Sequence, residues 1–158
     1  MFRFKKIIQY ERILYLLRFY DNYFTCPLSR RLNSLPDYAR KLQMNAVCIE
    51  AQVDGSVAGI AFFYANNLIT QKGYLTQIAV TQKYQGMGLA KKLLNIMEKI
   101  MLQNKMFEVE LEVEKNNKTA LCLYSNCGYR IIKSTDEAYF MRKELQRDVF
   151  LGKKRNDF

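Results

Sequence analysis

The sequence predicts a single mixed α/β domain over residues 1–158. Residues 107–114 alternate without a break between apolar side chains and glutamates, the pattern of a strand with one buried face. Residues 89–101 instead place apolar side chains at the spacing of an amphipathic helix. Asp54-Gly55, between two apolar runs, is typical of a tight hairpin turn. Because 49% of the 158 residues are apolar, the chain can bury one continuous core.

Two helices are expected before the first predicted strand. Over residues 5–20, apolar side chains recur at spacings of three and four (Ile7, Tyr10, Leu14 and Leu17). A loop follows, around residues 26–29. Ser34 is then a typical N-cap, with Asp37 completing a capping box, for a second helix that ends near Met44.

Strands and helices follow one another through the rest of the chain. The predicted segments are strands over 46–53, 56–65 and 73–80, a helix from Leu89, a strand over 107–114, a short helix over 117–126 that Gly128 ends, and strands over 129–133 and 138–143. The predicted order is therefore α-α-β-β-β-α-β-α-β-β, an α+β mixed sheet.

Composition excludes several kinds of catalysis. The chain has no histidine, which removes the Ser-His-Asp and Cys-His devices and most zinc sites. The net charge of +10 is uneven, because residues 1–45 hold nine Lys/Arg against three Asp/Glu and residues 142–158 hold six against three. These basic ends lack an aromatic-interleaved basic motif of the kind that binds nucleic acid. We therefore interpret them as solvated and expect no nucleic-acid partner.

The cysteines and the N-terminus point to the cytoplasm. The four cysteines form no CxxC motif and have no histidine partner, so we interpret them as reduced thiols and expect no metal; they are Cys26, Cys48, Cys122 and Cys127. Charged residues interrupt the apolar N-terminus, and polar residues interrupt the longest charge-free run, residues 55–71. We therefore expect neither a signal peptide nor a membrane span.

A loop with two glycines, Gln85-Gly86-Met87-Gly88-Leu89-Ala90, joins a predicted strand to a predicted helix. Glycine lets the backbone approach a ligand closely, and the first helical turn has N–H groups without intrahelical partners. With the helix dipole and Lys83, Lys91 and Lys92 nearby, the loop suits a phosphate or pyrophosphate. Two glycines alone are better explained by a tight strand-to-helix turn that binds no ligand. Neither a dinucleotide fingerprint nor a Walker-type loop matches these residues.

Three blocks in this order resemble one family. Gln85, Gly88 and Ala90 meet the motif Gln/Arg-x-x-Gly-x-Gly/Ala, the acyl-CoA pyrophosphate loop of the GNAT superfamily of N-acetyltransferases. Ile78-Ala79-Val80 before it resembles that family's fourth strand. Asn117-Lys118-Thr119-Ala120, Leu123-Tyr124 and Gly128-Tyr129 resemble its Asn-x-x-Ala…Leu-Tyr…Gly-Phe/Tyr signature. The agreement extends over residues 46–143.

The resemblance implies a GNAT-type acyl-CoA N-acyltransferase fold, with a twisted sheet that has helices on both faces and is splayed between its fourth and fifth strands. Acetyl-CoA would bind in that splay, with its pyrophosphate on residues 85–90. The residues then expected to bind the cofactor are Ile78, Ala79, Val80, Gln85, Gly86, Met87, Gly88, Leu89, Ala90, Lys91, Asn117 and Tyr124.

Asn117, Ala120 and Tyr124 share one face of the predicted short helix, at spacings of three and four. By residue type alone, Asn117 is equally a helix N-cap and Tyr124 an ordinary half-buried aromatic. The resemblance implies instead that the Tyr124 phenol lies beside the CoA sulfur and protonates the leaving thiolate. It also implies that a backbone N–H at Ala79 or Val80 donates to the oxyanion of acyl transfer.

The base that takes a proton from the attacking amine has several candidates. Many relatives carry a Glu on the fourth strand, where this chain has Gln77, which accepts no proton at neutral pH. Among the glutamates at 108, 110, 112 and 114, the mid-strand Glu112 is our candidate catalytic base. Glu50 and a relay of waters are the alternatives.

The resemblance places the acceptor under the first two helices and the loop between them, in residues 21–40. Side chains there and just before are suited to hold an anionic group or stack on a sugar: Tyr20, Tyr23, Phe24, Ser29, Arg30, Arg31 and Tyr38. We expect the acceptor to be a small primary amine, such as an amino sugar, acetylated by direct attack in a ternary complex. A protein lysine or N-terminus is the alternative, which an exposed acidic groove would favour, and an inactive acyl-CoA-binding module is another. Either a monomer or a homodimer is expected.

Overall fold

A seven-stranded mixed sheet runs through residues 1–146, the part of the chain that the computed structural model describes. Its strand order is β1-β2-β3-β4-β5-β7-β6. The strands are β1 (Arg3–Ile7), β2 (Val47–Val53), β3 (Ser56–Tyr64), β4 (Lys72–Val80), β5 (Glu108–Glu114), β6 (Arg130–Ser134) and β7 (Ala138–Glu144). The helices are α1 (Tyr10–Tyr20), α2 (Leu28–Arg31), α3 (Leu35–Asn45), α4 (Leu89–Gln103) and α5 (Lys118–Asn126), with short 3₁₀ turns η1 (Asp21–Tyr23) and η2 (Gln82–Tyr84).

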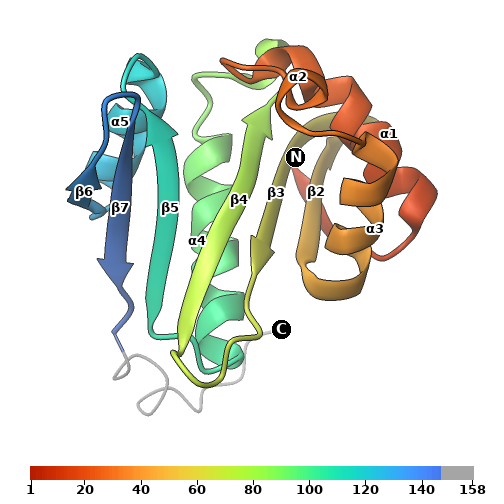
Figure 1. The fold of residues 1–158 in the computed structure, drawn as a ribbon. Helices are drawn as coiled ribbons and strands as arrows, with labels where there is room; N and C mark the ends of the chain where they lie inside the picture. The colour runs from red at the N-terminus through yellow and green to blue at the C-terminus, as the bar shows by residue number, and fades with distance from the viewer. Residues whose placement is uncertain (147–158) are drawn as a thin grey trace.

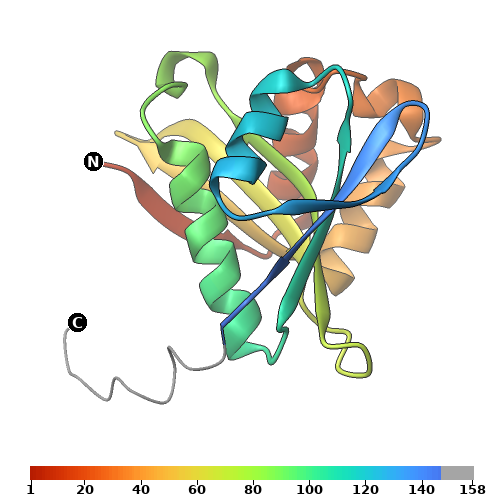
Figure 2. The same cartoon turned by 90° about the vertical axis from the view of Figure 1, so that its left-hand side faces the viewer.

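Helices cover both faces of the sheet, as predicted. Figures 1 and 2 show α4 and α5 on one face and α1, α2 and α3 on the other. Strand β3 shows how the two cores arise, because its side chains alternate between the faces. Ala61 and Phe63 pack in the cluster that includes α4, whereas Ile60 and Phe62 pack in the cluster that includes α1 and α3.

The N-terminus differs from the prediction, because residues 3–7 form strand β1 and the first helix begins only at Tyr10. Strand β1 pairs antiparallel with β2, and Lys5 lies opposite Glu50. The charged residues of β1 are exposed, while Phe2 and Phe4, on either side of Arg3, pack against the core. Ile7 fits a helical and a strand pattern alike, so only the pairing with β2 decides between them.

The predicted caps and turns are confirmed in part. Ser34 caps α3, with its Oγ accepting a hydrogen bond from the Asp37 N–H at 3.2 Å. The capping box is not completed, because the Asp37 carboxylate faces Arg40 instead, at 3.4 Å. Asp54 and Gly55 both have positive φ, 49° and 79°, as a tight hairpin turn requires.

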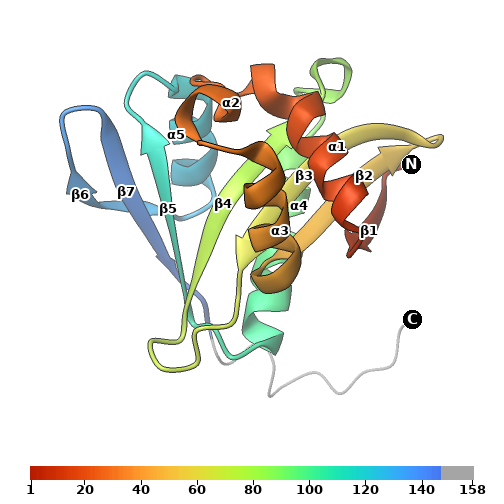
Figure 3. The same cartoon turned by 45° about the vertical axis from the view of Figure 1, so that its right-hand side comes forward.

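Strands β4 and β5 part at the middle of the sheet, which confirms the predicted splay. They pair in parallel from Lys72↔Glu108 to Leu75↔Leu111. Beyond this point β4 continues on β3 and β5 continues on β7 (Figure 3). A β-bulge marks the same place: Phe63 pairs with Leu75 and Phe62 with Gln77, which leaves Thr76 as the extra residue. The bulge therefore re-aims β4 where it leaves its neighbour.

Within residues 1–146, no helix is both long and apolar enough to cross a membrane. All four cysteines are free. Most of the predicted basic C-terminal stretch, residues 147–158, lies outside the described residues.

Candidate active site

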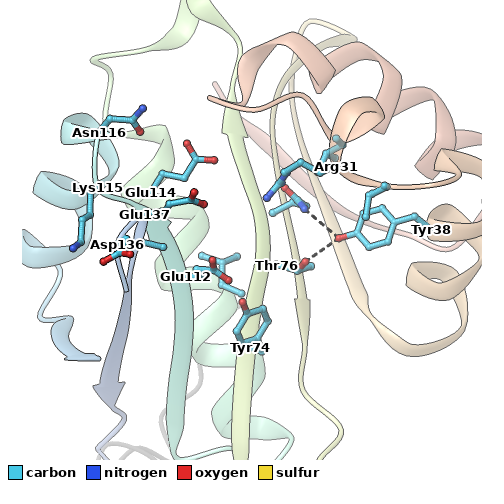
Figure 4. Close-up of a pocket in the computed structure, with 15 residues that line it drawn as sticks. Arg31, Tyr38, Tyr74, Thr76, Glu112, Glu114, Lys115, Asn116, Asp136 and Glu137 are labelled. Atoms are coloured by element: carbon cyan, nitrogen blue, oxygen red, sulfur yellow. Dashed lines mark hydrogen bonds between the residues drawn. The ribbon is translucent and has the colours of Figure 1, made fainter. Parts of the chain in front are cut away.

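A cleft lies where β4 and β5 part, and it has two connected portions. The outer cavity has a volume of about 730 Å³ and the inner cavity about 150 Å³. Five residues line both portions, which makes them one continuous cleft: Arg31, Thr76, Gln77, Glu112 and Glu114. Figure 4 shows side chains from β4, α2 and α3 facing those from β5 and the β6–β7 turn across it.

Hydrogen bonds fix the wall formed by α3 and β4. The Tyr38 hydroxyl lies 2.8 Å from Thr76 Oγ1, and Gln77 Nε2 donates to Tyr38 Oη at 3.2 Å (Figure 4). Gln77 is only 8% exposed although it is polar. Its Oε1 has no hydrogen-bond donor among residues 1–146, and it is not sealed from solvent. Since Gln77 lines both cavities, this oxygen is a hydrogen-bond acceptor offered to the cleft.

Tyr124 lies at the inner cavity, beside the two other residues predicted to share its helix face, Asn117 and Ala120. The Tyr124 side chain is nearly buried, at 6% exposure, and its ring packs 5.8 Å from that of Tyr129. Burial raises the pKa of the Tyr124 phenol above its usual value, so the phenol keeps its proton at neutral pH. Its hydroxyl has no partner within the described chain and is therefore available as a donor.

Asn117 serves as the N-cap of α5, with its Oδ1 accepting a hydrogen bond from the Ala120 N–H at 3.1 Å. The interpretation of Asn117 as a helix N-cap is therefore confirmed. Its position on the inner cavity also keeps it among the predicted cofactor contacts.

The loop over residues 85–90 has the geometry of an anion cradle. Gly86 and Gly88 have φ of 77° and 76°, and no atom lies within 4 Å of where a side chain would begin. Gly88 is the N-cap of α4 and offers no capping side chain, so the first N–H groups of this 15-residue helix remain open. Gln85 Nε2 donates to the Val80 carbonyl at 3.0 Å, which ties the loop to the end of β4. The flanking Lys83, Lys91 and Lys92 are exposed.

These features fit acetyl-CoA. Open N–H groups and lysines suit its diphosphate. Strand β4 has no β5 partner beyond Leu75, so backbone groups around Ile78 and Val80 face the splay and suit the amides of the pantetheine arm. Within the predicted cofactor set, Leu89 places its side chain in the core at 1% exposure, which leaves only its N–H to the loop. Met87 is 58% exposed.

Of the glutamates considered as bases, Glu112 and its neighbour Glu114 line the cleft and have no ion-pair partner within residues 1–146. Glu110 is held by Arg142 and Lys72; burial works to raise its pKa, but the hydrogen bond and charge of Arg142 outweigh it and lower the pKa. Glu50 does not line the cleft. It is fully buried and paired with Arg12.

The structure places some of the predicted acceptor residues on the cleft. Arg31 and Tyr38 line the outer cavity, and Tyr23, Phe24 and Arg31 line the inner one. Tyr20 is buried and bonds Thr81 at 2.8 Å, and Arg30 and Ser29 lie outside the cleft lining.

The lining residues that were not predicted as site residues include Tyr74, Glu114, Asp136 and Glu137. The alternation of residues 107–114 already placed Glu114 on the same face as Glu112. Nothing in the sequence indicated that the 134–137 turn folds back to the cleft, because that depends on β7 pairing between β5 and β6.

The splayed sheet, the anion cradle and the buried phenol together define the class, an acyl-CoA-dependent N-acyltransferase. A profile of the Acetyltransferase (GNAT) family matches residues 12–129. The chain therefore belongs to this family, whose members are acetyltransferases that use acetyl-CoA.

Curated relatives share shorter segments. The catalytic subunit of the N-terminal acetyltransferase B complex of Arabidopsis thaliana is 34% identical over 85 residues, which cover 49% of each chain. N-alpha-acetyltransferase 30 of Saccharomyces cerevisiae is 40% identical over 58 residues, 37% of this chain and 33% of the relative. The matched segments thus span about half or less of these relatives' lengths.

Solved structures share the fold over nearly the whole chain. The ribosomal-protein-S18-alanine N-acetyltransferase of Escherichia coli superposes with a TM-score of 0.74 at 18% identity, covering 100% of both chains. The PaiA N-acetyltransferase of Thermoplasma acidophilum, solved with coenzyme A, gives 0.72 at 16% identity and covers 91% of this chain and 99% of its own.

Proposed function

We propose that this protein transfers the acetyl group of acetyl-CoA to the α-amino group of a peptide or protein N-terminus. The observation that carries the proposal is the outer cavity, which continues from the inner cavity beside Tyr124 to carboxylates on the β5 and β6–β7 side. A cationic amine is attracted to such a wall. The relatives named as N-terminal and N-alpha-acetyltransferases support the same acceptor.

The small-amine acceptor expected from the sequence is the second candidate. The volume of the outer cavity argues against a small amine as the acceptor. The cavity alone measures about 730 Å³, far more than a single small amine fills, whereas several residues of extended peptide fit. The walls also come from elements far apart in the chain, α2, α3 and β4 on one side and β5 and the β6–β7 turn on the other.

Residues of the cleft divide the chemistry among them. Bound acetyl-CoA supplies a thioester carbonyl and a thiol leaving group. Glu112, directly or through water, takes the proton that the ammonium must lose before its nitrogen can attack the carbonyl carbon. The Ala79 N–H points to β3 in the antiparallel pairing, so the Val80 N–H, which faces the splay, donates to the carbonyl oxygen as it gains negative charge. Tyr124 donates its phenolic hydrogen to the departing sulfur, and the second proton that the nitrogen loses as the amide forms returns to the phenolate through water. An amide and coenzyme A result.

A ligand titration followed by an acceptor screen tests this function. Acetyl-CoA at 100 times its dissociation constant should stabilise the protein by about 2.7 kcal/mol in thermal unfolding, whereas ATP and NAD should not. Release of free thiol is then measured with peptides bearing a free or a blocked N-terminus, and with amino sugars. Faster release with free N-terminal peptides supports the proposal. Release with amino sugars alone, or equal stabilisation by all three nucleotides, contradicts it.

A further inference from the structure

We infer that the preferred acceptor carries a basic side chain close behind its N-terminal amine, and that Asp136 and Glu137 of the β6–β7 turn recognise it. This inference rests on the proposed function and names its substrate class. It depends on three observations, namely which carboxylates of the cleft are neutralised, how the turn is held, and what the buried side of the cleft offers.

Glutamates on the same face of β5 differ in whether a cation neutralises them. Where β5 is still paired with β4, Glu108 and Glu110 have Lys72 and Arg142 as partners. Where the two strands have parted, Glu112 and Glu114 line the cleft together with Asp136 and Glu137. None of these four is in an ion pair within residues 1–146. The chain has 25 Lys and Arg against 15 Asp and Glu, so this acidic wall stands against a basic background.

Two cationic residues line the cleft, and neither forms an ion pair with the wall within residues 1–146. Lys115 Nζ lies 5.1 Å from the centre of the Tyr139 ring, and Figure 4 shows this side chain directed away from Glu114 and Glu137, toward the side on which Asp136 lies. Arg31 belongs to α2 on the opposite side of the cleft. A cation from the acceptor can therefore approach the carboxylates without displacing a lysine or arginine of the protein.

Backbone hydrogen bonds hold the turn in place. The Thr135 N–H donates to the Ala138 carbonyl at 2.9 Å, and the Ala138 N–H donates to Thr135 Oγ1 at 3.1 Å. The Lys115 N–H donates to the Glu137 carbonyl at 2.9 Å, which ties the turn to the end of β5. Because the backbone is fixed, less ordering is needed when the two carboxylates meet a ligand.

The buried side of the cleft independently offers a hydrogen-bond acceptor that an N–H group of a ligand could meet. Gln77, more than nine-tenths buried, presents Oε1 without a donor from the described chain, as described above. Gln77, Glu112 and Glu114 line both cavities, whereas Asp136 and Glu137 line the outer cavity alone. A peptide would thus place its reacting amine near the first group and a following side chain near the second.

The experiment compares three peptides of equal length with free N-termini, Ala followed by Arg, by Ala or by Glu. Thiol release is measured for the native chain, for Asp136→Asn/Glu137→Gln and for Glu144→Gln. Glu144 is the control because it is an exposed acid at the other end of β7. For the native chain we expect the Arg peptide to have the lowest KM. In the double variant its KM should rise about fivefold, with kcat unchanged, since exposed ion pairs are individually weak. The control should keep the native preference.

A charge reversal strengthens the test. Asp136→Lys/Glu137→Lys should prefer the Glu peptide, and raising the salt concentration should erase the preference of both proteins. Equal KM values for all three peptides in the native chain would overturn this inference while leaving the proposed function intact. Absence of transfer to every peptide, with acetyl-CoA still stabilising the protein, would overturn the proposed function itself. Transfer to spermidine that is faster than to any peptide would overturn the peptide as acceptor.

Discussion

The phenolic oxygen of Tyr38 lies 2.8 Å from Thr76 Oγ1, at the bulged residue where β4 leaves β5. Helix α3 is therefore attached to the sheet at the point where the cleft opens. The same phenol accepts the hydrogen bond of Gln77 Nε2. Tyr38 thus connects the acceptor side of the cleft with the strand that is expected to hold the cofactor.

Replacing Tyr38 by Phe should weaken acceptor binding without affecting acetyl-CoA. The variant loses both hydrogen bonds and leaves the amide of Gln77, 8% exposed, without its partner. We expect a loss of about 1 kcal/mol in unfolding free energy and a higher KM for the acceptor. Urea unfolding and peptide kinetics measure these effects. Tyr10→Phe is the matched control, because the Tyr10 hydroxyl has no hydrogen bond within residues 1–146. An unchanged acceptor KM in Tyr38→Phe would contradict the role.

Gly88→Asp should abolish acetyl-CoA binding. The substitution places a negative charge at the N-terminus of α4, where the diphosphate is expected, and φ is 76° there. Gly55→Asp is a matched control, since Gly55 also has positive φ, 79°, and open space around it, but lies in the β2–β3 turn. Both variants carry the same backbone strain and the same added charge. Only Gly88→Asp should lose the thermal shift with acetyl-CoA, and equal losses in the two would argue against an anion site at this loop.

Most strands of the sheet and the loop expected to bind the cofactor could be predicted from the sequence, because local residue patterns specify their conformation. The alternation in β5, the Asp54-Gly55 turn and the loop over residues 85–90 each specify their own conformation. Strand β1 was missed because five residues on a sheet edge carry too little pattern to outweigh the helical spacing that follows. Without β1, residues 73–80 were the third predicted strand, although the resemblance treated the same segment as the family's fourth strand. The predicted sheet was therefore one strand short.

The acceptor side could not be predicted because it is assembled over long distances. Asp136 and Glu137 reach the cleft only through the order β5-β7-β6, and Tyr38 reaches Thr76 across 38 positions. Glu50 was a reasonable base by residue type. Nothing local revealed that Arg12, likewise 38 positions away, neutralises it.

Tyr124→Phe should leave acetyl-CoA binding and stability close to native and slow turnover. The Tyr124 hydroxyl has no hydrogen-bond partner in the described chain, so its removal breaks no structural contact, while the ring still packs on Tyr129. Loss of a proton donor to the leaving sulfur should lower kcat by about 100-fold or more. Thermal shift and thiol release measure the two properties separately. Tyr129→Phe is the contrasting variant: it loses a hydrogen bond to Glu98, 3.0 Å, and should lower stability rather than kcat. Native turnover in Tyr124→Phe would show that another group serves the sulfur.

Arg12→Ala should destabilise the protein in a pH-dependent way. Glu50 is fully buried, and Arg12, with a third of its side chain exposed, donates to Glu50 through Nε at 3.0 Å. Burial works to raise the pKa of Glu50, but hydrogen bonds from Arg12 and Gln52 outweigh it and hold the pKa below the ordinary 4.5. The pair therefore stabilises the fold above about pH 4.5, and this contribution is lost as the pH falls through the lowered pKa.

At pH 7 the Arg12→Ala variant leaves a buried carboxylate without its cation, which should cost about 3 kcal/mol, near the lower end for such pairs because Arg12 is partly exposed. At pH 4 the uncompensated Glu50 takes up a proton, so the difference from the native chain should shrink. Urea unfolding of both proteins at pH 4, 5.5 and 7 measures the gap. Arg40→Ala, which removes a solvent-exposed pair with Asp37, should change little at any of these pH values. If the Arg12→Ala gap is the same at pH 4 and pH 7, lost packing of the arginine stem, and not the charge of Glu50, accounts for the destabilisation.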